Sequence, residues 1–160
     1  MSASITGITG ATFTQGTQAW ENNKYQYAWS SHGIEHNMNP GLIVSAASKS
    51  DIIATLAYAR SKKLAVAIRT GGHQYSGASS TAAPNILLDV SRTFRKPEDL
   101  KLLSELVEKP RKGEEGSWKE GEKRRLVYVS VSHALDEFNL WMGKQGVFVP
   151  HGEYFEFPSL

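Results

Sequence analysis

The chain of 160 residues contains no cysteine. This absence excludes disulfide bonds, a thiolate nucleophile and any zinc site built from cysteine. No uninterrupted apolar run approaches the roughly 18 residues of a membrane span, so we expect no membrane partner. The first 14 residues lack a basic start followed by an apolar core, so we expect no signal peptide and take a cytoplasmic location as the default.

The chain also lacks a large excess of basic or of acidic residues. The net charge is +2, and residues 95–125 hold ten basic and eight acidic residues, which leaves eight of each sign elsewhere. A mixed-sign stretch of this kind is typical of a solvated loop. Nucleic-acid binding would favour a one-sign patch with aromatic residues, so we expect no nucleic-acid partner. With 40% hydrophobic and 21% charged residues, the composition fits a globular protein.

The residue pattern of the first part predicts an α/β fold. Residues 1–24 begin with many glycine, serine and threonine residues, and we predict a poorly ordered lead-in there. Apolar runs at 42–44, 65–68 and 86–88 predict buried strands. Between the first two runs, Ser48 is suited to begin a helix. Strand, helix and strand within about thirty residues form a βαβ unit with parallel strands.

The second part predicts the start of another subdomain. Residues 95–125 are expected to form a charged loop, in which 100–107 could be a short helix. Alternating apolar residues predict a strand over 126–131, followed by a helix capped by Ser132, with Leu135, Phe138 and Met142 on one side and Gly146 at its end. Residues 147–149 predict a final strand. The predicted fold is therefore a small parallel sheet with flanking helices (25–94), then the start of a second α/β subdomain (126–152).

One loop has the composition of a ligand-binding site. Directly after the predicted strand at 65–68, residues 69–77 read Arg-Thr-Gly-Gly-His-Gln-Tyr-Ser-Gly. Paired glycines permit positive φ and a close approach of the backbone to a ligand, and consecutive N–H groups can form an anion-binding nest. The spacing matches neither the dinucleotide fingerprint nor the Walker A loop. The expected ligand is a pyrophosphate. The alternative, which stays open, is an ordinary Gly-Gly connection between two strands with a histidine on the surface.

The same loop carries a resemblance to a known family. Together with Asn39-Pro40, the run 42–44, the segment 88–91 and the stretch 137–152, it resembles the FAD-binding (PCMH-type) domain of berberine-bridge-enzyme-like oxidases, which belong to the vanillyl-alcohol-oxidase type of flavoproteins. These matches cover most of residues 25–152. The Arg-x-Gly-Gly-His pattern is their most specific part.

The resemblance implies a cofactor and its ligands. The cofactor is FAD, and His73 matches the histidine that bonds covalently to the 8α carbon of the flavin. The residues that match the loop around the pyrophosphate are Thr70, Gly71, Gly72, Gln74 and Ser76. The implied activity is that of an FAD-dependent oxidoreductase that takes a hydride from a small organic substrate. No catalytic residue is implied, because the family's catalytic base usually lies in a later domain.

The chain also departs from the family. Tyr154 stands where many members carry a second flavin-bonding cysteine, so His73 is the single expected tether. The resemblance ends at Gly152, and the tail 153–160 looks unrelated, so we expect a truncated domain without its substrate domain. We do not expect the isolated chain to catalyse the oxidation of a substrate. Two alternatives therefore stay open, an inactive relic and an interaction fragment that binds a complementary chain.

Other ionisable residues suggest little chemistry. We expect His133 on the surface, His151 in a structural turn and Asp89 bonded to backbone donors at a strand end. His32 and His36 would suit a metal only on one helix, which Gly33 disfavours, so we expect no metal.

Overall fold

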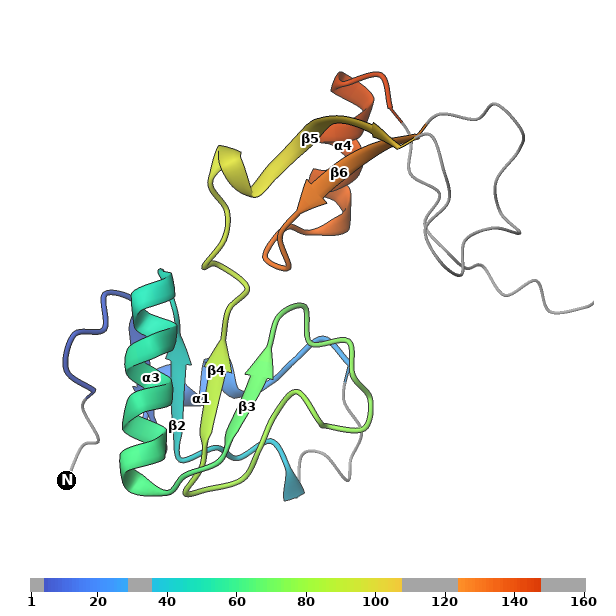
Figure 1. The fold of residues 1–160 in the computed structure, drawn as a ribbon. Helices are drawn as coiled ribbons and strands as arrows, with labels where there is room; N and C mark the ends of the chain where they lie inside the picture. Colours follow the sequence, from blue (N-terminus) through green and yellow to red (C-terminus); the bar gives the residue numbers. More distant parts are fainter. Residues whose placement is uncertain (1–4, 29–35, 108–123, 148–160) are drawn as a thin grey trace, which may run out of the picture.

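The computed structural model describes residues 5–28, 36–107 and 124–147. Figure 1 shows two lobes joined by the passage after β4. The larger lobe contains a four-stranded sheet in the order β1-β2-β4-β3. Strands β2, β4 and β3 run parallel, and β1 pairs antiparallel with β2 at the edge. The strands are β1 (Ala11–Thr14), β2 (Leu42–Ser45), β3 (Val66–Arg69) and β4 (Ile86–Asp89).

The two faces of this sheet form two apolar layers. Because side chains alternate along a strand, Val44 and Leu88 face one side while Ile43 and Leu87 face the other. The first side packs against α3 (Lys49–Lys62), and the second packs against Trp20 of α1 (Gln18–Lys24). Figure 1 shows α3 in front of the sheet and α1 behind it. The central strands β2 and β4 are thus buried on both faces, which explains their uninterrupted apolar sequences.

The predicted strands and helix of the first lobe are confirmed. Ser48 caps α3, with its hydroxyl accepting a hydrogen bond from the Asp51 N–H at 3.3 Å. The strands β2 and β3 are parallel, as the βαβ pattern predicts, but they are not neighbours, since β4 lies between them. An α/β class with a small parallel sheet is therefore confirmed.

The prediction of a poorly ordered lead-in at residues 1–24 is wrong for its described part. Strand β1 and helix α1 both lie within it, and Trp20 is only 4% exposed. The indole Nε1 donates to the carbonyl of Pro40 at 2.9 Å. Tertiary contacts with β2 thus order a segment whose own composition favours a coil.

Asp51 ties this N-terminal segment to the first turn of α3. Its carboxylate is completely buried and accepts hydrogen bonds from the N–H groups of Thr9, Gly10 and Ala47, each at 2.9 Å. Burial raises the pKa of this carboxyl, but the hydrogen bonds from Thr9, Ala47 and Gly10 outweigh burial and lower it from 3.8 to about 2.

The smaller lobe corrects two further predictions. Residues 100–107 are a strand, β5 (Leu100–Val107), which pairs antiparallel with β6 (Arg124–Val129). The range 95–125 is therefore not simply a charged loop, since β5 and the start of β6 lie inside it. The sequence Leu-Lys-Leu-Leu-Ser-Glu-Leu-Val fits both a helical and a strand period. Pairing with a distant strand decides the outcome.

Helix α4 (Leu135–Lys144) follows β6, but Ser132 does not cap it. Its cap residue is Ala134, whose N–H donates to the Glu137 side chain at 3.0 Å. Ser132 instead joins the lobes, donating to the Val90 carbonyl at 2.6 Å and accepting from the Phe94 N–H at 3.1 Å. Phe138 and Met142 are buried as predicted, whereas Leu135 is exposed.

The end of α4 matches the sequence pattern. Gly146 follows the helix with a φ of +63°. Of the strand predicted at 147–149, only residue 147 lies within the described residues, and His32, His151 and the tail 153–160 also lie outside them. Within the described ranges, no helix is long and apolar enough to cross a membrane.

Candidate functional site

The loop that follows β3 lines a cavity at the carboxyl end of the parallel strands. The cavity has a volume of about 360 Å³. Its lining residues are Ile68, Thr70, Gly71, Gly72, His73, Gln74 and Ser79. Ligands of open α/β sheets characteristically bind at this end of the strands. Five of the six predicted site residues therefore meet in one cavity. Ser76 is exposed and, in the described part of the chain, is not among the lining residues.

Arg69 fixes the start of this loop. Its guanidinium is buried, and Nε and Nη2 both donate to Asp89 Oδ2, at 2.9 and 2.7 Å. The remaining N–H groups donate to the carbonyls of Asn23, Lys24 and Tyr25, which lie at the end of α1. Arg69 thus satisfies the last carbonyls of α1 while its own charge is neutralised by Asp89.

The pairing of Arg69 with Asp89 was within reach of sequence reasoning. Each residue directly follows a predicted strand, and the structure places the two opposite each other in register. Asp89 was expected to bond to backbone donors. That part is confirmed, because its other oxygen accepts from the Ser91 N–H at 2.9 Å.

Gly72 brings the loop close to the segment after α1. Its φ is +69°, and a Cβ on it would lie 2.7 Å from the Gln26 Cβ. At the same point, the N–H of Ala28 donates to the Gly72 carbonyl at 2.8 Å. Only glycine permits both this backbone conformation and this approach.

Gln26 connects the segment after α1 to the loop through hydrogen bonds, a role that the sequence did not suggest. The side chain is buried, and its Nε2 donates to the carbonyls of Ala28 and Gln74 at 2.6 and 2.8 Å. Its Oε1 accepts from the Ser79 hydroxyl at 2.7 Å. The bonds to Gln74 and Ser79 connect Gln26 to the loop, but no local pattern signals them, because Gln26 lies about 50 residues before these two partners.

Among the described residues, the lining of the cavity offers donors and no acidic side chain. Within the described residues, the backbone N–H groups of Gly71, Gly72, His73 and Gln74 make no hydrogen bond. The hydroxyl of Thr70 and the amide of Gln74 add neutral polar groups. Consecutive unpaired N–H groups beside a glycine with positive φ are the elements of an anion-binding nest.

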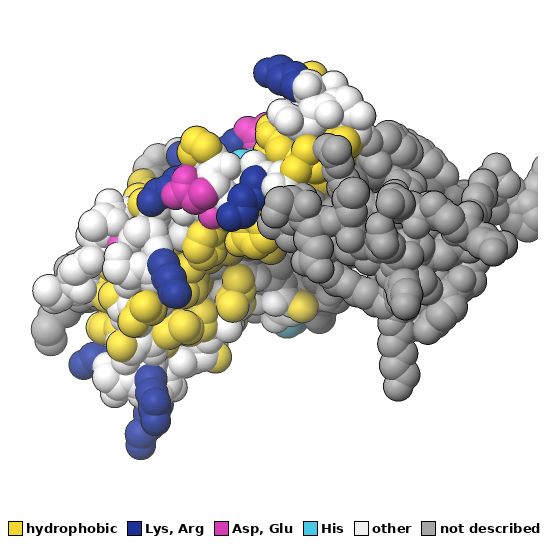
Figure 2. Space-filling model, turned by 45° about the horizontal axis from the view of Figure 1, so that its top comes forward, with side chains coloured by type: hydrophobic (Ala, Val, Ile, Leu, Met, Phe, Trp, Pro, Cys, Tyr) yellow, Lys and Arg dark blue, Asp and Glu magenta, His cyan; other side chains and the backbone are white. Residues whose placement is uncertain are grey.

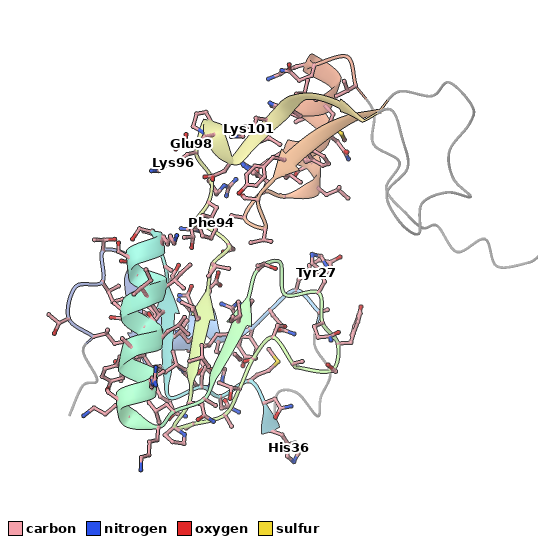
Figure 3. All side chains as sticks on the ribbon, viewed as in Figure 1. Tyr27, His36, Phe94, Lys96, Glu98 and Lys101 are labelled. Carbon is pink, nitrogen blue, oxygen red and sulfur yellow. The ribbon has the colours of Figure 1, made fainter. Side chains whose placement is uncertain are left out.

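His73 lies exposed at this cavity and touches two residues. A Cβ on Gly71 would lie 2.7 Å from the imidazole Cδ2 and 3.0 Å from Nε2, so this edge of the ring rests against the backbone at Gly71. The Tyr27 ring lies on the imidazole, with ring centroids 4.6 Å apart and an interplanar angle of 46°. In Figure 3, Tyr27 stands beside the loop that follows β3.

The expected surface position of His133 is wrong. Its side chain is only 10% exposed, and Nε2 is buried without a hydrogen-bond partner. Nδ1 lies 3.9 Å from the Glu137 carboxylate. As for metals, the described ranges contain no group of three His, Asp or Glu side chains that could hold an ion.

The comparisons with known proteins find a family model that matches the region of this loop. Residues 40–107 match the family model described as an FAD binding domain. Over these residues, which make up less than half of the chain, the sequence is similar to an FAD binding domain. The matched range contains β2, α3, β3, β4 and the whole loop, so the FAD binding domain includes every predicted site residue. No curated protein matches the sequence of the chain.

Several solved structures are similar to the chain at low identity. A 6-hydroxy-D-nicotine oxidase from Arthrobacter nicotinovorans has 22% identity and a TM-score of 0.49, covering 57% of this chain and 19% of its own. A Phl p 4 variant titled a glucose dehydrogenase has 20% identity and a TM-score of 0.45, covering 51% and 17%. A Physcomitrella patens BBE-like 1 protein has 14% identity and a TM-score of 0.44, covering 59% and 21%. The chain thus spans about a fifth of their length.

The residues of the loop fit the cofactor that the family implies. FAD carries a pyrophosphate, which requires several N–H donors at close range and no facing carboxylate. The cavity supplies backbone N–H groups that make no hydrogen bond within the described residues, in a loop whose positive φ and close approach to Gln26 require glycine at position 72. The imidazole of His73 stands at the same cavity.

Proposed function

We propose that the chain binds FAD in the cavity of residues 70–74, with the pyrophosphate on the backbone N–H groups and the flavin attached to His73. The observation that supports this proposal is a run of backbone N–H groups in the cavity lining that make no hydrogen bond within the described residues, in a loop whose shape depends on Gly72. When bound, FAD would accept a hydride from a substrate.

The chain's own residues would bind and orient the cofactor. Thr70 and Gln74 would add side-chain hydrogen bonds beside the backbone nest. Gln26 and Arg69 would hold the loop in its binding shape, because their buried polar groups are bonded across it. His73 would supply a nucleophilic nitrogen at the flavin end. We further propose that the full activity is oxidation of a small organic molecule.

A titration of the flavin-free chain with FAD, followed by flavin fluorescence, tests the binding claim. Gly72→Ala adds a Cβ against Gln26 at a positive φ, so we expect FAD affinity to fall by about 100-fold or more. Gly146→Ala is the matched control, because its φ of +63° is similarly strained but nothing lies within 4 Å of the new Cβ. The proposal fails if both variants bind FAD as the wild type does, or if the folded wild type binds none.

A surface of the larger lobe supports a second role, as an interaction fragment. Ile53 and Leu56, three residues apart on α3, are 59% and 45% exposed. Figure 2 shows hydrophobic side chains gathered on the face of this lobe, with Lys and Arg side chains at its edge. Exposed apolar clusters of this kind mark contacts with other chains. Light scattering would show a larger assembly for the wild type, and Leu56→Gln would shift it to monomer; a monomeric wild type would exclude self-association there.

A further inference from the structure

Tyr27 combines exposure with a specific contact. Its side chain is 76% exposed, so burial contributes little to its place in the fold. Its ring nevertheless lies 4.6 Å from that of His73, centroid to centroid, which is within the range of attractive aromatic contacts. The backbone beside it is fixed, because Gln26 is buried and Ala28 bonds to Gly72. An exposed ring is therefore held by a rigid segment against one partner.

His73 is restrained on two sides as a result. The backbone at Gly71 meets the Cδ2 and Nε2 edge of the imidazole, and the Tyr27 ring lies over it. The part of the chain described by the structure shows no hydrogen bond to either ring nitrogen. Within the described residues, two packing contacts and no polar partner thus set the direction of the imidazole.

We propose that Tyr27 is a positioning residue that holds the His73 imidazole in the orientation needed for its bond to the flavin. This inference rests on the proposed function. The bond joins an imidazole nitrogen to the 8α methyl carbon, so one N–H and one C–H bond break. The two electrons and two protons pass to the isoalloxazine ring, and molecular oxygen takes them up as hydrogen peroxide. A freely rotating imidazole would spend little time in line with the methyl carbon, whereas a restrained one is poised for the attack.

Tyr27 and His73 meet through their rings, so the test variants differ in whether they keep the ring of residue 27. Tyr27→Phe keeps the ring and should keep the effect, while Tyr27→Ala removes it. Tyr75→Ala is the matched control, because Tyr75 is also an exposed tyrosine, at 69%, and the described residues show no ring contact to it. Since all these side chains are exposed, we expect the thermal unfolding midpoint to stay unchanged.

The test separates covalent from total flavin. The full chain is incubated with excess FAD in air, and flavin is measured before and after acid precipitation. For Tyr27→Ala we expect total bound FAD within about two-fold of the wild type and a rate of covalent attachment at least about ten-fold lower. Tyr27→Phe and Tyr75→Ala should attach FAD at the wild-type rate.

Any other result would contradict the positioning role of Tyr27, the bond to His73 or the binding of FAD. Equal attachment rates in Tyr27→Ala and the wild type would contradict the positioning role of Tyr27 and leave the proposed binding of FAD intact. So would a parallel loss of total and covalent flavin in Tyr27→Ala, which would show that Tyr27 only supports binding. A wild type that binds FAD without attaching it would contradict the His73 bond and the positioning role with it. A wild type that binds no FAD would contradict the proposed function itself.

Discussion

Arg69 and Asp89 stand opposite each other on neighbouring parallel strands and are joined by two hydrogen bonds, at 2.9 and 2.7 Å. The pair lies at the carboxyl end of the sheet, where the loop of the site begins. Through Arg69, this point also connects to the carbonyls at the end of α1. The base of the site is therefore a polar network that links α1, β3 and β4.

The geometry of that network predicts that a lysine cannot replace Arg69. Arg69→Lys keeps the charge but not the planar fork that reaches Asp89 and three carbonyls at once. We expect the free energy of unfolding to fall by about 2 kcal/mol, because buried carbonyls lose their donors. Urea unfolding measures this change. The exposed Arg92→Lys is the control, and equal unfolding midpoints for the two variants would contradict the role of Arg69.

Asp51 predicts a dependence of stability on pH. Its folded pKa of about 2 lies below the ordinary 3.8, so the carboxylate stabilises the fold fully above pH 3.8. This contribution, about 2 kcal/mol, is lost as the pH falls through about 2. Asp51→Asn should therefore be less stable than the wild type at pH 7, and the difference should shrink towards pH 2. Urea unfolding at pH 7, 4 and 2 tests this; a constant difference would refute the role of the charge.

Trp20 tests whether the N-terminal segment is part of the fold. Trp20→Phe keeps most of the packing against Ile43 and Leu87 but leaves the Pro40 carbonyl without its indole donor. We expect a loss of about 1–2 kcal/mol in the free energy of unfolding, measured by thermal or urea unfolding. A disordered lead-in would show no loss, so an unchanged midpoint would argue against the docked α1.

The sequence predicted those elements whose signals are local. The strands β2, β3 and β4 are apolar runs bounded by turns, and Ser48 marks the start of α3. Elements that depend on distant partners were missed. The strand β1 is a short polar segment that pairs with β2 some thirty residues later, and β5 becomes a strand through pairing with β6.

The same distinction holds at the site. The loop itself was evident, since its glycines and histidine are consecutive in sequence. Its supports were not, because Gln26, Tyr27 and the carbonyls bound by Arg69 come from residues 23–28, more than forty positions earlier. No spacing rule connects these residues. Only the folded chain brings them together.

Acid precipitation of the chain, purified after expression with a riboflavin supply, tests the central claim most directly. The account predicts that flavin stays in the protein pellet of the wild type. His73→Ala should bind FAD in solution but release all of it into the supernatant, since the nest of residues 70–74 remains while the attachment point is gone. A folded wild type that is colourless before precipitation would contradict the account, and so would flavin retained in the His73→Ala pellet.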